Sequence, residues 1–296
     1  MHEDVWHFVG HEVGVEDLRL IREVVGRFGG LSRGELVHTV CELLEWKRPT
    51  GRLKGRECRE FLERLEGAGV LTLPGKRTGR PVGSRTRVPM TARGDAQVGL
   101  AGTVRDIAPI VIERVQAADD RLLFREFVGR YHYLGHAVPF GAHLRYLVYA
   151  STPQRRVVAC VQFSSPAWRM ASRDAWIGWD DATRARHLPL VVNNSRFLIL
   201  PWVRVRNLAS TVLSRVARQL EADWTVRYGA RPVLLETLVD PARFDGASYR
   251  AANWIVVGET TGGGRREQAR PRTARAPKLV LLYPLAKDAA RRLRGR

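Results

Sequence analysis

Three acidic residues in the second half of the chain could do the chemistry of a metal site. Glu236 and Asp240 lie near the end of a predicted strand over residues 232–239, and their spacing places them on one face of that strand. Together with Asp174 they would offer the oxygen ligands that Mg²⁺ prefers, with room left for a phosphate. The three residues are therefore predicted metal ligands and catalytic residues for phosphodiester cleavage or strand transfer.

A structural role for these carboxylates is the open alternative. Buried carboxylates are usually paired, so Glu236 could form an ion pair with a buried arginine such as Arg196. Asp240 could instead cap the turn that follows it, DPARFDG. In either role the side chain would hold the fold together and would not bind a metal.

Two arginines occupy the connection between a predicted strand at residues 196–203 and a predicted helix at residues 207–224. The first turn of a helix has free backbone N–H groups, and arginine forms charge-assisted hydrogen bonds with phosphate. Arg204 and Arg206 are therefore predicted to bind a phosphate of DNA. The alternative is ordinary surface charge.

Aromatic and histidine side chains give weaker candidates. A tyrosine of the segment at residues 131–133 could attack a phosphodiester, although such clusters usually pack in a core. His132 and His136 have the spacing of metal ligands on a helix, but Gly135 interrupts that helix. The tryptophans that could stack on unpaired bases, or pack in the core, are Trp176, Trp179 and Trp202.

Arginine dominates the charge of the chain. Its 296 residues include 49 Lys and Arg against 30 Asp and Glu, which gives a net charge of +19. This balance predicts nucleic acid as the partner, or less often an anionic membrane, although a GC-rich genome could contribute to it. No stretch is apolar enough to predict a membrane span, and no signal sequence is evident. The three cysteines are widely spaced and form no C-x-x-C pair, which disfavours zinc ribbons and redox motifs and fits a cytoplasmic protein.

Residues 1–75 are predicted to form a winged helix-turn-helix. Helical periodicity predicts three helices before residue 67, and residues 70–74 predict a short strand. Such folds place one helix in the major groove of DNA. A protein-interaction module is the alternative, because glutamates on the third helix dilute its positive charge. The basic residues of that helix expected to contact DNA are Lys54, Arg56, Arg59 and Arg64.

The remainder of the chain is predicted to be a flexible linker followed by a second domain. Residues 76–103 are rich in glycine, proline and arginine, which is typical of a flexible linker. An arginine-rich linker can also lie along the phosphate backbone of DNA. The second domain, residues 104–296, contains a basic loop at residues 262–278 that could close on nucleic acid through Arg265 and Arg266. Its other expected elements are strands at residues 144–149, 157–163, 255–260 and 279–283, and helices at residues 119–131, 181–187 and 247–254.

Five segments of the second domain resemble the DruA family, named for the Druantia anti-phage defence system. Relatives of this family also occur beside transposases of insertion sequences. The resemblance implies a context of mobile elements, phage defence and DNA, and Asp174, Glu236 and Asp240 all lie in the matching segments. These segments are YHYLG at 131–135, RDAWIGW at 173–179, NNSRFLILPWVRVRNLAS at 193–210, LLETLVD at 234–240 and YRAANWIVVGETTG at 249–262.

The order of elements also resembles the GNAT acetyltransferase fold. The expected fold class is therefore α+β, with a winged helix-turn-helix before a GNAT-like mixed-sheet domain. That fold cradles the pyrophosphate of acetyl-CoA at the turn where this chain has Arg204, in the pattern Arg/Gln-x-x-Gly-x-Gly/Ala. Asn207 replaces its first glycine, which opposes close backbone approach. Tyr249 falls where the fold often carries a general-acid tyrosine, and is the fourth catalytic candidate.

Three functions follow from these observations. The first is a DNA-binding protein of a mobile element or defence system that processes DNA as a Mg²⁺-dependent nuclease or transposase. The second is a non-catalytic DNA-binding adaptor that recruits a separate transposase or helicase. The third, an acyl-CoA-dependent acyltransferase, is the least favoured because of Asn207. The expected partners are DNA and a transposase or defence-system helicase, with no membrane.

Overall fold

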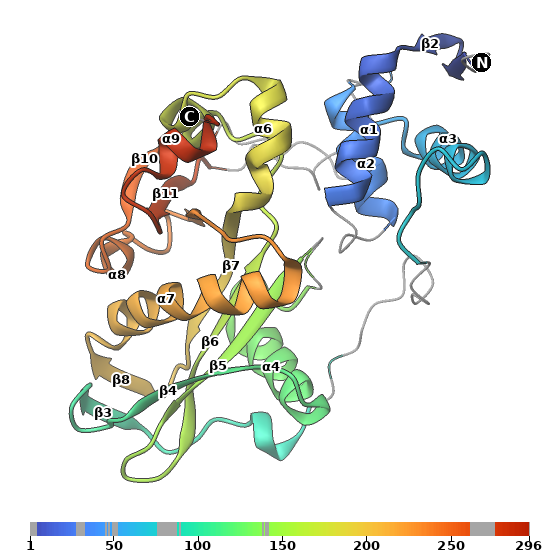
Figure 1. The fold of residues 1–296 in the computed structure, drawn as a ribbon. Helices are drawn as coiled ribbons and strands as arrows, with labels where there is room; N and C mark the ends of the chain where they lie inside the picture. Colours follow the sequence, from blue (N-terminus) through green and yellow to red (C-terminus); the bar gives the residue numbers. More distant parts are fainter. Residues whose placement is uncertain are drawn as a thin grey trace.

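The structure is a computed structural model that describes residues 5–27, 33–44, 46, 48, 53–75, 88, 90–137, 139, 142–260 and 276–295. Three helices with their own apolar core make up the N-terminal part, and a large mixed sheet with helices around it makes up the rest (Figure 1). The described residues therefore have the mixed α+β architecture expected from the sequence.

The N-terminal helices form as expected, at α1 (Val15–Arg27), α2 (Arg33–Leu43) and α3 (Gly55–Gly67). The strand expected at residues 70–74 does not form. Side chains bind its backbone instead: the Glu66 carboxylate accepts from the N–H of Leu73 at 2.9 Å, and the guanidinium of Arg33 donates to the carbonyl of Pro74 at 2.8 Å. The winged-helix assignment remains a prediction.

A hairpin at the chain start, which we did not expect, covers the core of these helices. It consists of β1 (Trp6–Phe8) and β2 (His11–Val13). The Phe8 ring stacks on Trp46 with 3.6 Å between centroids and meets the edge of Phe61. Aromatic burial explains why this short segment is ordered against the helices.

The second part is built on a seven-stranded sheet in the order β10-β11-β9-β7-β6-β5-β4. Among these strands only β7 and β9 are parallel, and the others pair antiparallel. Along the chain, these strands and the helices between them follow the order expected of a GNAT-like domain. The strands are β4 (Ile110–Arg114), β5 (His143–Ala150), β6 (Arg156–Ser164), β7 (Val191–Ile199), β9 (Leu234–Val239), β10 (Ile255–Glu259) and β11 (Leu279–Pro284).

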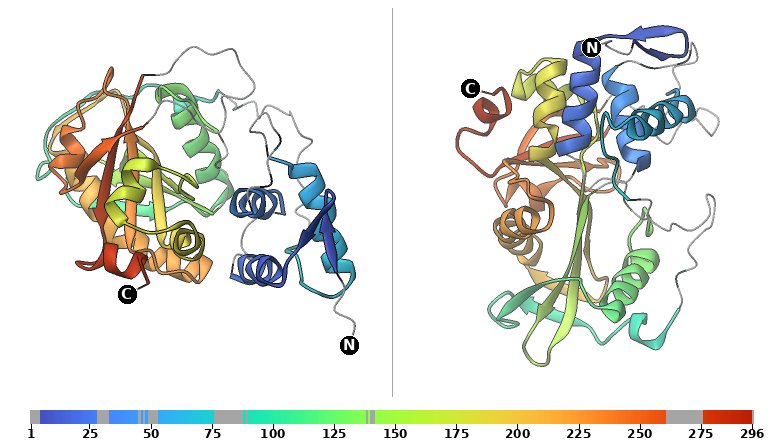
Figure 2. Two further views of the ribbon diagram at one scale, coloured as in Figure 1. Left: turned by 90° about the horizontal axis from the view of Figure 1, so that it is seen from above. Right: turned by 45° about the vertical axis from the view of Figure 1, so that its right-hand side comes forward.

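Helices cover both faces of this sheet. Successive strand residues point to opposite faces, and β5 shows the result: the Tyr146 hydroxyl donates to Asp223 of α7 (Leu208–Tyr228), whereas Arg145 lies over the Phe124 ring of α4 (Ala118–Tyr131). The helices α7 and α4 therefore lie on opposite faces (Figure 2). A separate core, around Ile177, packs α5 (Ala171–Ile177), α6 (Asp181–His187) and α9 (Ala289–Leu293) beside β11.

The expected strand at residues 196–203 is wrong in its boundaries. The strand β7 begins at Val191 and ends before Pro201, which has no N–H for the ladder. Residues 203–206 then form a separate strand, β8 (Val203–Arg206), which pairs parallel with β3 (Leu100–Thr103). The arginines of this segment therefore lie on a strand, and α7 begins directly after it.

Part of the expected linker is ordered. Thr91 donates through its hydroxyl to the Glu126 carboxylate of α4 at 2.8 Å, and the Tyr131 hydroxyl donates to the carbonyl of Gly94 at 2.9 Å. Gly94 belongs to a short 3₁₀ turn, η1 (Ala92–Gly94), and a Cβ there would collide with Glu126. Residues 90–103 thus pack on the second part of the chain, which begins before residue 104.

Across the described part of the chain, no helix is both long enough and apolar enough to cross a membrane.

Candidate functional site

Two of the three predicted metal ligands meet at a buried arginine. Glu236 and Arg173 are both 0 % exposed, and Arg173 Nη1 donates to Glu236 Oε2 at 2.9 Å. Asp174 accepts from Arg173 Nε at 2.9 Å. The partner of Glu236 is therefore Arg173, and Arg196, which we had suggested, instead donates to the carbonyls of Gly135 and Ser195.

The guanidinium of Arg173 is fully used by the protein. Besides the two carboxylates, Nη1 donates to the carbonyl of Ala167 at 2.7 Å and Nη2 donates to that of Trp168 at 3.0 Å. Burial raises the pKa of Glu236, and the charge and hydrogen bond of Arg173 oppose that rise. Such a network ties the segment before α5 to strand β9 and leaves no donor on Arg173 for a ligand.

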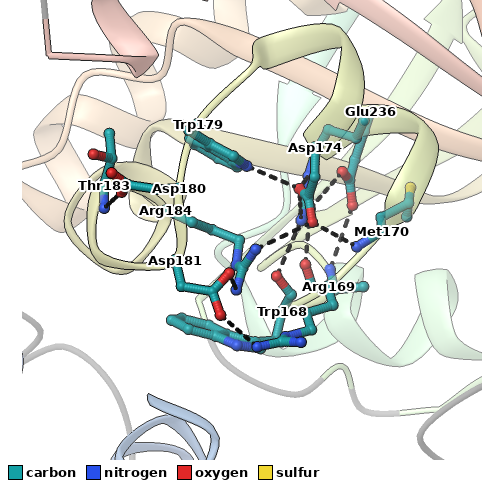
Figure 3. Close-up of polar contacts among 12 residues, drawn as sticks. Trp168, Arg169, Met170, Asp174, Trp179, Asp180, Asp181, Thr183, Arg184 and Glu236 are labelled. Carbon is teal, nitrogen blue, oxygen red and sulfur yellow. Dashed lines mark hydrogen bonds and ion pairs between the residues drawn. The ribbon is translucent and has the colours of Figure 1, made fainter. Parts of the chain in front are cut away.

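The same network continues toward the surface through α6. Asp174 Oδ1 accepts from the Trp179 indole at 3.1 Å, and Asp174 Oδ2 lies 3.6 Å from Arg184 Nη1. Arg184 and Arg169 both pair with Asp181 (Figure 3). The charges alternate in sign from the surface to the buried centre, as in a structural ion-pair network.

Asp240 lies apart from this network. Its carboxylate accepts from the N–H of Ala242 at 3.1 Å, so it caps the turn after β9, as the structural alternative predicted. Among the described residues, no group of three or more His, Cys, Asp or Glu side chains is placed to hold a metal ion. A Mg²⁺ ion at Asp174 and Glu236 would have to displace Arg173. The residues therefore do not fit the expected magnesium site.

Tyr249 lies at the point where β7 and β9 separate. The two strands pair only up to Asn193 and Glu236. Just beyond, the Tyr249 hydroxyl donates to Asn194 Oδ1 at 2.6 Å, and Thr237 donates to the Asn194 carbonyl at 3.0 Å. Burial raises the pKa of Tyr249, so the phenol stays protonated at neutral pH. A protonated tyrosine can donate a proton or a hydrogen bond but is a poor nucleophile.

The remaining aromatic candidates have structural contacts. Trp202 packs against the rings of Phe127 and Tyr131 in the main core. Trp176 and Trp179 pack around the smaller core near α5. These contacts favour core packing over stacking on bases.

His132 and His136 lie in a positively charged surrounding. Burial, with the nearby charge of Arg196, lowers the pKa of His132 to about 4. Burial and the charges of Arg145 and Arg125 lower the pKa of His136 to about 4 as well. Both imidazoles are thus neutral at pH 7, and the surrounding arginines disfavour a bound cation.

The lowered pKa of His136 should make the free energy of unfolding depend on pH. With a folded-state pKa of about 4 for His136 and an ordinary value near 6.5, the unfolded chain binds more protons between these limits. Stability should therefore fall as the pH is lowered through this window, by on the order of 1–3 kcal/mol for this residue. Urea unfolding across the window should show a weaker pH dependence for His136→Gln than for the wild type. The exposed His7→Gln is the control, and equal pH dependence in all three proteins would contradict the prediction.

Arg204 and Arg206 lie where a phosphate could approach. They are two residues apart on β8, so their side chains share one face, and both are exposed. They line a pocket of about 450 Å³ together with Gly102 and Thr103 of β3. Neither arginine has an ion pair with another described residue. Asp106 is turned toward β3, where its carboxylate accepts from the N–H and hydroxyl of Thr103 at 2.7 and 2.8 Å.

Helix α7 begins directly beyond these arginines. Its N-cap, Asn207, has a left-handed backbone with φ of 61° and makes no side-chain capping hydrogen bond. The N–H groups of the first turn of this 21-residue helix therefore have no capping partner from Asn207. The N–H groups at a helix start, beside two arginines that have no carboxylate partner among the described residues, favour an anion.

The predicted DNA contacts of the N-terminal helices are less uniform. Arg56 pairs with Glu60 at 3.0 Å, and Lys54 lies 5.8 Å above the Phe8 ring. Arg64 donates to the carbonyl of His7, whereas Arg59 is exposed and has no carboxylate partner in the described part of the chain. DNA contact by Lys54, Arg56 and Arg59 remains a prediction. Arg265 and Arg266 lie outside the described residues.

Sequence reasoning missed Arg173 as the centre of the buried network. Arg173 is 63 residues from Glu236 in the chain, and local periodicity carries no signal for such a pair. One available signal was that Arg173 adjoins Asp174 in an otherwise apolar and aromatic segment. An arginine inside such a segment needs a buried carboxylate partner.

Comparisons with known proteins agree with the family resemblance. The family model described as Druantia protein DruA matches residues 95–270. No curated protein is similar in sequence to this chain. Among solved structures, spermidine N-acetyltransferase from Vibrio cholerae is similar with 9 % identity and a TM-score of 0.37, covering 59 % of this chain and 95 % of its own. An N-acetyltransferase from Staphylococcus aureus Mu50 is similar with 8 % identity and a TM-score of 0.36, covering 60 % of this chain and 98 % of its own.

Proposed function

The chain belongs to the DruA family of the Druantia anti-phage defence system, and on this premise we propose that it binds DNA for a defence system or mobile element. The main support for this proposal is the pair Arg204 and Arg206. Both are exposed on one face of β8 and have no carboxylate partner among the described residues. Guanidinium groups in this state bind phosphate oxygens by charge-assisted hydrogen bonds. The net charge of +19 adds long-range attraction for a polyanion.

The protein is proposed to act as an adaptor, with a separate transposase or helicase supplying the chemistry. Two of the proposed metal ligands, Asp174 and Glu236, are held by Arg173, and the third, Asp240, caps a turn. This supports a binding role over metal-dependent cleavage by these three residues. An acyltransferase role is not favoured, because β8 pairs with β3 in the place where the pyrophosphate turn was expected.

DNA binding should not require a divalent metal. The full chain is titrated into fluorescently labelled duplex DNA, and anisotropy is measured in Mg²⁺ and in EDTA. We expect the same affinity in both, within about twofold, since arginine–phosphate contacts need no metal ion. The labelled duplex should also remain intact in Mg²⁺ and in Mn²⁺. Two results would instead support the hypothesis of a metal-dependent nuclease. One is binding that is lost in EDTA, and the other is cleavage that Glu236→Ala and Asp240→Ala abolish in proteins that remain folded.

A further inference from the structure

A second basic pocket lies on the rim of the sheet, away from Arg204 and Arg206. Its volume is about 480 Å³, and it opens between the end of β4, the start of β5, the start of α4 and the end of α7. Pockets of this size hold small molecules or a single nucleotide. The charged and polar side chains around it include Arg114, Arg121, Arg145, Arg227, His143 and Tyr228.

Arg145 is the most unusual of these side chains, because it is buried and its hydrogen-bond partner, Gln162, is neutral. It is 7 % exposed, and its Nε donates to Gln162 Oε1 at 3.0 Å. No carboxylate pairs with it among the residues that the structure describes. Burial and the neighbouring charges of Arg125 and Arg121 lower the pKa of Arg145 to about 10, so it remains cationic at pH 7. A buried cation of this kind is expensive unless an anion reaches it.

The other arginines leave the pocket with an excess of positive charge. Arg114 lies 3.7 Å from Asp223, whose carboxylate also accepts from Tyr146. Arg121 donates to the carbonyl of Gln116, and Arg227 is exposed above the ring of Tyr228. Neither Arg121 nor Arg227 has a carboxylate partner in the described part of the chain. Arg121, Arg145 and Arg227 thus line the pocket without a carboxylate partner among the residues that the structure describes.

We propose that this pocket binds a terminal phosphate, carried either by a free nucleotide or by the phosphorylated end of a nucleic-acid strand. Four arginines line this one pocket, which matches an anion with more than one charge, and their forked donors match phosphate oxygens. The site goes beyond the proposed contact with the DNA backbone and shares no residue with it. Loss of either binding activity can therefore be observed without the other.

The test uses the full chain with two series of probes. Inorganic pyrophosphate and ATP probe the free-nucleotide source by isothermal titration, without DNA. Oligonucleotides that differ only in a 5′-phosphate or 5′-hydroxyl probe the strand end by anisotropy. The variant is Arg121→Ala with Arg227→Ala, in which both changes are at exposed positions, and the control is the exposed Arg218→Ala on the same helix as Arg227.

We expect at least one series to depend on the pocket. Binding of pyrophosphate or ATP that weakens 10-fold or more in the double variant but not in Arg218→Ala supports a free nucleotide. A preference for the 5′-phosphate that disappears in the double variant supports a strand end. A third variant, Arg145→Lys, keeps the charge but loses the fork, and should weaken the same probe. The proposal is overturned if no probe binds, or if the double variant binds each probe as the wild type does.

Discussion

An Arg173→Met variant is expected to have a free energy of unfolding about 3–5 kcal/mol lower than the wild type, as for other buried pairs that lose one partner. Arg173 is 0 % exposed and pairs with Asp174 and Glu236 at the same time. Without it, a fully buried carboxylate at Glu236 would have no countercharge, and the carbonyls of Ala167 and Trp168 would lose their donor. Urea unfolding followed by circular dichroism measures the difference.

A second variant separates lost charge pairing from lost packing. Adding Glu236→Gln to Arg173→Met removes the uncompensated carboxylate, so the double variant should recover about 1–3 kcal/mol of the loss. Two results would contradict the structural network: a single variant as stable as the wild type, or a double variant no more stable than the single one. Mg²⁺ provides an independent check, because a metal bound to Asp174 and Glu236 would raise the Tm of the wild type. We expect no such increase.

Replacing Arg204 and Arg206 together by alanine is expected to weaken binding to duplex DNA about 10- to 100-fold at low salt. Each arginine would contribute a charge-assisted contact to phosphate, and such contacts contribute about 1.5–3 kcal/mol before electrostatic screening reduces them. The two side chains are exposed on a strand edge, so their loss should not change the stability of the fold. Anisotropy titrations with one labelled duplex measure the change.

The matched control removes the same charge elsewhere. Arg291 and Arg292 lie on α9 and both pair with Asp288, at 2.8 and 2.7 Å. Their double replacement by alanine also lowers the net charge by two, but removes arginines that already share a carboxylate partner. We expect it to bind DNA nearly as well as the wild type. Equal weakening in the two double variants would mean that overall charge, and not the β8 site, governs binding.

Local patterns predicted most helices and strands of the second part. The helix expected at residues 181–187 forms at α6, Asp181–His187, where the Asp180 side chain caps the N–H of Thr183. The strands around β5, β6 and β11 were recognised because their residues are apolar in continuous runs, as in buried strands. For such elements the sequence near the element decides the structure.

Features that depend on distant residues could not be predicted. The strand β8 exists because Val203–Arg206 pairs with Leu100–Thr103, about a hundred residues earlier in a segment with a linker-like composition. Likewise, the strand expected at residues 70–74 does not form, and side chains of Glu66 and Arg33 form hydrogen bonds with its backbone instead. Propensity describes a segment in isolation, and tertiary partners override it.

The sequence identified residues of the candidate site and their possible structural roles, but it did not show how these residues are arranged in space. Buried pairing of Glu236 and capping by Asp240 were correctly stated as alternatives, because a carboxylate in an apolar strand needs a partner. The identity of that partner required the fold. The buried Arg145 pocket had no local signal, since a single arginine inside an apolar strand does not reveal which elements surround it.

The salt dependence of DNA binding tests the proposed role of Arg204 and Arg206 most directly. The logarithm of the binding constant for duplex DNA falls with the logarithm of the salt concentration by roughly 0.9 for each phosphate contact. We expect a steep slope for the wild type and a slope shallower by about 1.8 for the Arg204→Ala, Arg206→Ala variant. The Arg291→Ala, Arg292→Ala control should keep the wild-type slope. A flat wild-type dependence, or an unchanged slope in the β8 variant, would contradict the proposed DNA-binding site.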